Sequence, residues 1–264
     1  MSVCYIEKSK IKKLDILNVE GGINYYKLYN TKKPDYIINL ALYDSLKNAI
    51  NITNMEDENI KSGYLFSADG IGIKGEKEIL WTTKNNAYNS DEIRDFVSGS
   101  PVLVRDGKVD IDWGNKYSSY VDQKHIRSAI GFNDKYVILY VSDKELKIKD
   151  LAKEMIKLGC KYAINCDGGG SSHLQQGNRF YRKSLRNNAS WFLVYMNEEE
   201  YEMKNYINYS SKSIPVYETT ECKKKIGSLD PYEQCICLYE MDNYKVVLYN
   251  ITGKTIKKVG FIKE

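Results

Sequence analysis

The chain has 264 residues, of which 39 are basic and 35 are acidic, for a net charge of +4. Hydrophobic residues make up 42% of it, which excludes an intrinsically disordered chain and leaves enough apolar surface for a sizeable core. Charges of both signs are interspersed, so we expect no nucleic-acid partner. No run approaches about 18 apolar residues, and the first 15 residues lack an apolar signal segment, so we expect neither a membrane partner nor a leader peptide.

Short apolar or alternating runs predict strands in the first half of the chain. These runs are residues 36–42, 64–68, 71–73, 76–83, 101–104 and 109–111. Asp69-Gly70 and Asp106-Gly107 are typical turn pairs, so each is expected to join two strands of a hairpin.

The pattern that follows predicts a strand, a helix and a second strand. Residues 136–141 and 162–165 are apolar strands, and between them apolar residues recur at helical spacing from Ile148 to Ile156. Gly159 stands where a helix C-cap glycine is expected. Such a unit implies a right-handed crossover between two parallel strands. We therefore expect an α+β or α/β fold, a mixed sheet with packed helices, over residues 1–197.

The last part of the chain has a different pattern of residues. Residues 198–213 are polar and predict a linker, after which five short strands are expected around residues 215–218, 226–229, 235–240, 245–249 and 259–262. About fifty residues of short strands predict a small β-barrel over residues 214–264.

The cysteines and histidines of the chain show no spacing that is typical of a metal site. The chain has six cysteines and two histidines, with no C-x-x-C pair, and Cys235 and Cys237 are too close together for common zinc spacing. We expect free thiols in a reducing compartment, with a disulfide in the C-terminal part left open. No cofactor and no metal site are predicted, and a need for a divalent metal is left open.

The loop directly after the second strand carries the clearest chemistry. It reads Asp167-Gly168-Gly169-Gly170-Ser171-Ser172, and loops that follow strands in α/β sheets often hold ligands. Three glycines allow the backbone to approach a ligand closely and to adopt positive φ, successive N–H groups can bind an anion, and the serines add donors. Asp167 adds an acid, base or nucleophile. The pattern suits a phosphate ester, although an ordinary glycine-serine turn has the same composition.

Several segments in order resemble the phosphodiester glycosidase family. They are residues 38–44, 98–108, 127–131, 142–143, the helix at 151–159 and the loop at 163–172, so the resemblance runs from about residue 34 to residue 196. The sequence departs from the family pattern at His173, where a threonine is usual, and at Leu40-Ala41, where two glycines are usual. These departures concern the substrate more than the reaction.

The resemblance implies cleavage at the anomeric carbon of a sugar phosphodiester. It implies Asp167 as nucleophile or base, with Asp143 as the second candidate, and His173 as an acid or as a structural residue. The implied phosphate ligands are Gly168, Gly169, Gly170, Ser171, Ser172, Arg127 and Arg186. Asn39 and Asp44 are the implied sugar contacts, and each of these residues could also serve the fold alone.

The C-terminal part resembles a bacterial SH3-type domain in short motifs such as Pro215-Val216-Tyr217 and Ile226-Gly227-Ser228-Leu229. That resemblance implies binding to a cell-wall polymer, which would place the substrate among wall sugar phosphates. The protein is expected to be made in the cytoplasm and, for a wall substrate, to be released by lysis, as for a phage-associated factor. Two alternatives stay open: a hydrolase of a small intracellular sugar-phosphate or nucleotide-like diester, and a non-catalytic phosphoglycan-binding protein.

Overall fold

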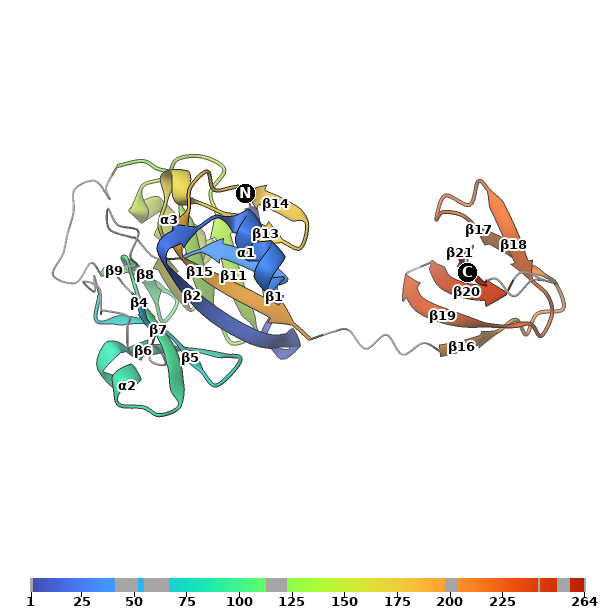
Figure 1. Ribbon diagram of the computed structural model, residues 1–264, viewed down its shortest axis with the longest axis horizontal. Coiled ribbons are helices and arrows are strands. Elements are labelled where there is room, and N and C mark those ends of the chain that lie inside the picture. Colours follow the sequence, from blue (N-terminus) through green and yellow to red (C-terminus); the bar gives the residue numbers. More distant parts are fainter. Residues whose placement is uncertain are drawn as a thin grey trace. The chain divides into compact units, whose positions relative to one another are not determined.

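The structure is a computed structural model that describes residues 2–40, 52–54, 67–112, 123–197, 204–241, 243–250 and 257–263. The chain divides into two compact units, Met1–Asn197 and Glu198–Glu264, shown in Figure 1. No helix in the described ranges is long and apolar enough to span a membrane. Each unit is considered by itself below.

The N-terminal unit is built on three antiparallel sheets. The first sheet has the order β1 (Ser2–Glu7), β11 (Tyr136–Val141), β10 (Ser128–Phe132), β12 (Tyr162–Asn165), β8 (Val102–Arg105) and β9 (Lys108–Asp112). The second has the order β14 (Arg179–Arg182), β13 (Leu174–Gln176), β3 (Tyr36–Asn39), β15 (Asn188–Met196) and β2 (Ile11–Ile23). The third has the order β4 (Ile52–Asn54), β7 (Ile93–Ser98), β5 (Asp69–Lys74) and β6 (Glu78–Thr83).

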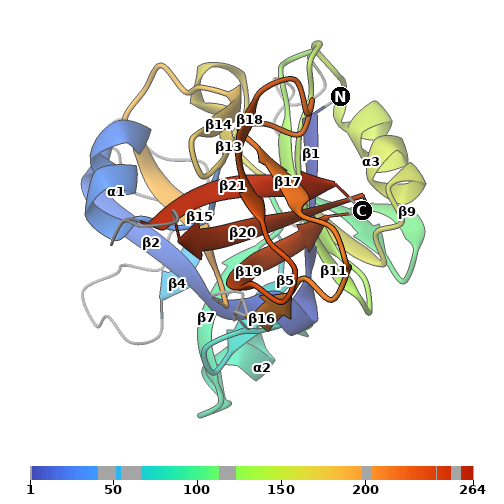
Figure 2. The same cartoon turned by 90° about the vertical axis from the view of Figure 1, so that its right-hand side faces the viewer.

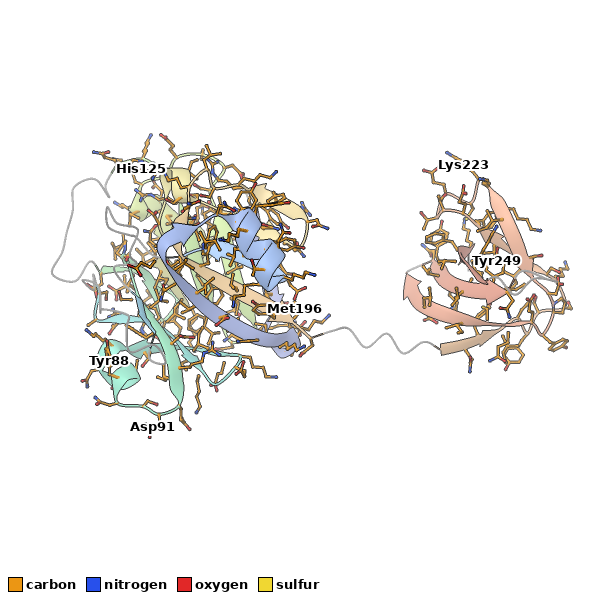
Figure 3. All side chains as sticks on the ribbon, in the orientation of Figure 1. Tyr88, Asp91, His125, Met196, Lys223 and Tyr249 are labelled. Carbon is orange, nitrogen blue, oxygen red and sulfur yellow. The ribbon has the colours of Figure 1, made fainter. Side chains whose placement is uncertain are left out.

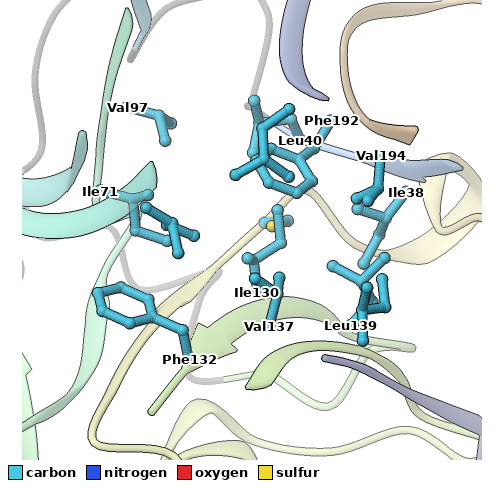
Figure 4. Packing of buried hydrophobic residues seen from close by; sticks show 14 of the residues in the cluster. Ile38, Leu40, Ile71, Val97, Ile130, Phe132, Val137, Leu139, Phe192 and Val194 are labelled. Carbon is cyan, nitrogen blue, oxygen red and sulfur yellow. The ribbon is translucent and has the colours of Figure 1, made fainter. Parts of the chain in front are cut away.

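The main core joins side chains from all three sheets. Ile130 and Leu139 come from the first sheet, Ile38 and Phe192 from the second and Ile71 from the third, and all five belong to one buried cluster, shown in Figure 4. Each is essentially removed from water, and burial of one such side chain contributes roughly 1.5–3 kcal/mol. Burial of these apolar faces therefore holds the sheets together.

Two helices cover the sheets from outside this core. Helix α1 (Tyr25–Lys32) buries Leu28 in a separate cluster with Ile37, Trp191 and Leu193 of the second sheet. Helix α3 (Ile148–Lys157) packs its apolar stripe on the first sheet. The predicted helix, its two flanking strands and the positive φ of 81° at Gly159 are all confirmed. A third, short helix, α2 (Lys84–Tyr88), follows β6.

The predicted fold class is wrong. The structure is β-rich, and the strand pairings between its described residues are antiparallel, rather than those of a mixed sheet dominated by packed helices. Strands β11 and β12 do run in the same direction, but β10 lies between them and is antiparallel to both. Strand β10 is not predicted from the sequence, because residues 127–131 resemble a family motif and most of this strand lies within that motif.

A second correction concerns Asp69-Gly70, which opens strand β5 and does not form a hairpin turn. A Cβ atom on Gly70 would lie 2.0 Å from the carbonyl oxygen of Val97 on the neighbouring strand β7. Glycine is therefore needed at position 70 because the neighbouring strand comes close, and not because the chain turns there. The other predicted hairpin, β8 to β9 around Asp106-Gly107, is confirmed.

The C-terminal unit is one antiparallel sheet. Its order is β16 (Lys204–Ile207), β19 (Gln234–Met241), β20 (Tyr244–Asn250), β21 (Lys257–Lys263), β17 (Ile214–Tyr217) and β18 (Lys225–Leu229). Strands β19, β20 and β21 cross the unit side by side in Figure 2. The five predicted strands are present, and β16 comes from the segment expected to be a linker.

The predicted closed barrel is wrong, because no pairing between described residues joins the edge strands β16 and β18. The sheet still has its own buried cluster, which includes Val216, Leu229 and Val247. Tyr249, labelled in Figure 3, is also buried there and donates its hydroxyl to the carbonyl oxygen of Ile226 at 3.1 Å. All six cysteines of the chain are free thiols.

Candidate functional site

The glycine loop bridges the two main sheets. It leaves the first sheet at the end of β12, passes through a single 3-10 turn at Gly169–Ser171 and enters the second sheet at β13. Its backbone is tied to both sides, because the Cys166 N–H donates to the Ser128 carbonyl and the Asp167 N–H donates to the Leu40 carbonyl. The loop is therefore fixed where the sheets meet.

Asn39, the last residue of β3, connects the two ends of the loop. Its Nδ2 donates to the carbonyl oxygen of Asp167 at 2.7 Å, and its Oδ1 accepts from the backbone N–H of His173 at 2.9 Å. Its side chain is 1% exposed. Both amide atoms thus serve the backbone of the loop, so the structure favours the positioning role for Asn39 over a direct sugar contact.

Asp167 presents its carboxylate at the start of the loop. The residue is half-buried, and its Oδ1 accepts the backbone N–H of Gly168 at 2.8 Å. Both the main chain and the side chain of Asp167 are thus held in place before any ligand arrives. Such preorganisation suits a group that must meet a reacting atom in one geometry.

The glycines of the loop are needed for two different reasons. A Cβ atom on Gly168 would lie 2.6 Å from the carbonyl oxygen of Ile126, so no larger residue fits without a shift. Gly169 has a φ of 61°, in the left-handed region. The N–H groups of Gly168 and Gly169 donate to Asp167 and Ile126, and those of Ser171 and Ser172 donate within the turn. These four amides, expected to face a phosphate, have protein acceptors.

Arg186 brings a positive charge to the same loop. A Cβ atom on Gly170 would lie 2.9 Å from Nε and 3.2 Å from Cζ of Arg186, so the guanidinium rests against this glycine. The segment is held there because Leu185 N–H and Ser184 Oγ both donate to the Gly170 carbonyl. Arg186 is exposed, which leaves its fork accessible to an anion.

Arg127 lies deeper, with 3% of its surface exposed. Its Nε donates to the carbonyl of Leu146 at 3.0 Å and its Nη2 donates to the carbonyl of Gln123 at 2.7 Å. Its side chain also approaches Gly168, since Cδ is 3.8 Å from where a Cβ on that glycine would lie. These hydrogen bonds tie the Arg127 guanidinium to the segments that contain Gln123 and Leu146.

Asp143 lies at the same edge of the first sheet as Asp167. Strand β10 begins at Ser128, which pairs with Val141 at the end of β11. The next residue, Ala129, pairs with Asn165 at the end of β12. Strands β11 and β12 therefore end on the two sides of the start of β10. Asp143 is exposed, and its Oδ1 accepts from the Ser2 hydroxyl at 2.8 Å. Asp44, the other expected carboxylate, lies outside the described residues.

His173 is fully buried and tightly surrounded. Its ring stacks on Tyr25 at 4.8 Å between centroids and meets Trp191 edge-on at 5.3 Å. Nδ1 accepts from the Ser184 N–H at 3.2 Å, so the neutral ring carries its proton on Nε2 and donates to Gln175 Oε1 at 3.3 Å. Burial lowers the pKa of His173 to about 4. The ring is therefore neutral at pH 7 and serves the fold.

We expect this histidine to make the protein less stable in mild acid. The unfolded histidine has a pKa near 6.5 and the folded one near 4, so the unfolded chain binds the extra proton first. Stability is complete above pH 6.5 and falls by up to about 3 kcal/mol as the pH drops toward 4. Urea unfolding at pH 7.5 and 5.0 measures the loss, which His173→Asn should reduce and His125→Asn should leave unchanged. An unchanged pH dependence in His173→Asn would contradict the assignment.

Two supporting residues were missed by the sequence reading. Asn188 donates from Nδ2 to the carbonyl of Ser171 at 3.0 Å, and Ser184 bonds the loop through Gly170 and His173. A polar Asn188 immediately before the apolar run of β15 was the available signal. In the described part of the chain, no group of three or more His, Cys, Asp or Glu residues is arranged to hold a metal ion.

Solved structures with a similar fold include two proteins. The zebrafish N-acetylglucosamine-1-phosphodiester alpha-N-acetylglucosaminidase catalytic domain, auto-inhibited by its pro-peptide, has a TM-score of 0.59 and 16% identity over 70% of this chain and 74% of that chain. A hypothetical protein from Synechocystis has a TM-score of 0.53 and 11% identity over 74% of this chain and 59% of that chain. At such identities the likeness concerns the fold.

Comparison with curated protein sequences gives no match. The family comparison does: residues 20–195 match the phosphodiester glycosidase family. That segment is more than half of the chain and contains β3, the glycine loop and Arg186, which are the parts of the site described above. The chain belongs to the phosphodiester glycosidase family.

Proposed function

We propose that the N-terminal unit hydrolyses the anomeric C–O bond of a sugar-1-phosphodiester. The observation that carries the proposal is the glycine loop itself. In this loop the Asp167 carboxylate accepts the Gly168 N–H and the Asp167 main-chain carbonyl accepts from the Asn39 amide, and three residues later the Arg186 guanidinium lies against Gly170. A carboxylate on the glycine loop and a cation packed against that loop match the two charges that develop when such a bond breaks.

In the proposed reaction the C–O bond between the anomeric carbon and the phosphate oxygen breaks. The electron pair leaves with the phosphate, water supplies the oxygen that ends on the sugar, and the products are a free sugar and a phosphate monoester. Asp167 faces the positive charge that forms at the anomeric carbon, as nucleophile or as base for the water. Arg186 holds the phosphate as its negative charge grows.

The state of His173 agrees with this mechanism. A phosphate monoester leaves readily, so the reaction depends less on a general acid than hydrolysis of an ordinary glycoside does. His173 has both ring nitrogens bonded inside the protein and a pKa lowered by burial to about 4, so it offers no acid to the substrate. The proposed chemistry needs none from it.

The products of a single assay test the proposal. The purified chain is incubated with the methyl phosphodiester of N-acetylglucosamine-1-phosphate in water enriched in ¹⁸O. Free N-acetylglucosamine carrying ¹⁸O at C1, together with unlabelled methyl phosphate, is the expected result. Release of N-acetylglucosamine-1-phosphate would show cleavage of a P–O bond and would refute the mechanism.

Arg186→Ala is expected to lower kcat/KM for this diester by about 10²-fold, because a guanidinium that meets the leaving phosphate contributes most in the transition state. Arg186→Lys should recover part of the loss, since it returns the charge without the fork. Arg182→Ala, in the neighbouring strand β14, is the matched control and should change kcat/KM less than threefold. Equal losses in the two alanine variants would remove Arg186 from the proposed site.

A further inference from the structure

A tight turn in the C-terminal unit places a tyrosine where glycine is expected. The Glu233 N–H donates to the Asp230 carbonyl at 2.9 Å, which closes a four-residue turn with Pro231 and Tyr232 in its centre. Tyr232 has a φ of 62°. A turn with proline second and a positive φ third is type II, and its third position favours glycine. The backbone there is strained by carrying a side chain.

The strained residue gains little packing for its side chain, which is 74% exposed. A second exposed tyrosine follows directly after the residue that binds the Tyr232 backbone. Tyr209 is 76% exposed, and its preceding residue, Asn208, accepts the Tyr232 N–H on its carbonyl at 2.7 Å. Tyr209 and Tyr232, the tyrosine pair, are the two most exposed large hydrophobic side chains in the described part of this unit.

The tyrosine pair stands on a rigid support. Asn208 is fully buried, and its Nδ2 donates to the carbonyls of Lys212 and Leu229, both at 2.9 Å. Its Oδ1 accepts from the Ser210 N–H. One buried amide thus fixes both loops. Strained backbone that persists in a fixed frame, with no gain in packing, is typical of ligand sites.

The charges beside the tyrosine pair select among ligands. Asp230 is exposed, and Glu233 accepts the Asp230 N–H on Oε2 at 2.8 Å, so two carboxylates flank Tyr232 in the turn. They repel a polyanion and accept hydrogen bonds from hydroxyl groups. Tyrosine adds a flat apolar face with a polar tip at small entropic cost. An uncharged ligand with apolar ring faces and many hydroxyls fits both properties.

We propose that the tyrosine pair binds the uncharged sugar rings of a glycan. The apolar faces of pyranose rings pack on Tyr209 and Tyr232, and Asp230 accepts from the ring hydroxyls. This site lies in the unit that does not contain the glycine loop, and it goes beyond the proposed hydrolysis, on which it does not depend. It gives the chain a place to hold a carbohydrate without reacting with it.

The test measures binding by the full chain to a panel of soluble neutral oligosaccharides, namely hexamers of glucose, N-acetylglucosamine, galactose and mannose, by isothermal titration calorimetry. At least one hexamer is expected to bind. Tyr232→Gly should weaken that binding about tenfold or more, because the ring is lost. The same variant should melt no lower than the unaltered chain, because glycine accepts the positive φ of the turn.

This pairing of outcomes separates a ligand site from a structural role, since a tyrosine needed for folding would lower the melting temperature when replaced. Tyr209→Ala should weaken binding similarly, and replacement of Tyr26, a tyrosine of the N-terminal unit that is 68% exposed, by alanine should leave binding unchanged. Binding to none of the hexamers, or undiminished binding by Tyr232→Gly, overturns the proposal. Turnover of the soluble methyl diester should be equal in all these variants, so a failure of the hydrolysis proposal shows itself separately.

Discussion

Asp167→Asn is expected to lower kcat on a sugar-1-phosphodiester by about 10³-fold or more. The asparagine amide is a poor nucleophile and a poor base, and it removes the negative charge that faces the anomeric carbon in the transition state. The substrate should still bind, because Arg186 and the other residues of the glycine loop are unchanged, so KM should move less than kcat. Steady-state kinetics on the purified variant measure both constants.

This substitution is well suited to the site because it preserves the local fold. An asparagine retains the Oδ1 that accepts the Gly168 N–H, and the main-chain bonds to Leu40 and Asn39 do not involve the side chain. The free energy of unfolding should therefore change by less than about 1 kcal/mol. Loss of activity with unchanged unfolding assigns the effect to chemistry.

Asp143→Asn provides the comparison. Asp143 is the other carboxylate at this edge of the first sheet, and its Oδ1 bonds to the Ser2 hydroxyl. We expect a smaller loss of kcat in this variant, because its side chain is exposed and is not part of the glycine loop. If Asp143→Asn abolished turnover while Asp167→Asn retained it, the roles of the two carboxylates would be exchanged and the proposed centre would move.

The sequence predicted single elements better than their arrangement. Strand β11, helix α3 and strand β12 were located correctly, because apolar periodicity is a property of a few neighbouring residues. The same pattern implied two parallel strands, and β11 and β12 do run in the same direction, but β10, from another part of the chain, lies between them and pairs antiparallel with both. Which strand inserts between two others is decided by long-range packing, which local patterns do not contain.

The site shows the same division. Asp167 and the glycines are candidates because of their order in one loop, and the need for glycine at position 168 comes from close approach to the Ile126 carbonyl and not from the expected approach to a ligand. A backbone-bonding role for Asn39 was one of two alternatives, but its partner could not be predicted, because Asp167 lies 128 positions away. Nor could the burial of His173 be predicted, since Tyr25 and Trp191, which enclose its ring, come from distant segments. Sequence patterns identified groups capable of chemistry, and the fold determined which of them remain accessible.

The long-range contact of Asn39 gives a prediction that links stability to activity. Asn39→Asp keeps the size of the side chain and the oxygen that accepts from the His173 N–H. It replaces Nδ2, which donates to the Asp167 carbonyl at 2.7 Å, with an oxygen that repels that carbonyl. The new carboxyl is also buried. At pH 7 the free energy of unfolding should therefore fall by about 3 kcal/mol, measured by urea denaturation.

The activity of Asn39→Asp should fall even under conditions in which the variant stays folded. The Asp167 backbone is held between Asn39 and Leu40, so loss of the Asn39 bond lets the Asp167 carboxylate leave its position, and a displacement of about 1 Å can cost about 10²-fold in rate. Asn178→Asp is the matched control, because Asn178 is exposed and its Oδ1 accepts the Tyr29 hydroxyl at a long distance of 3.4 Å. If Asn39→Asp were as stable and as active as Asn178→Asp, the loop would not depend on Asn39, and the link between this strand end and the position of Asp167 would be lost.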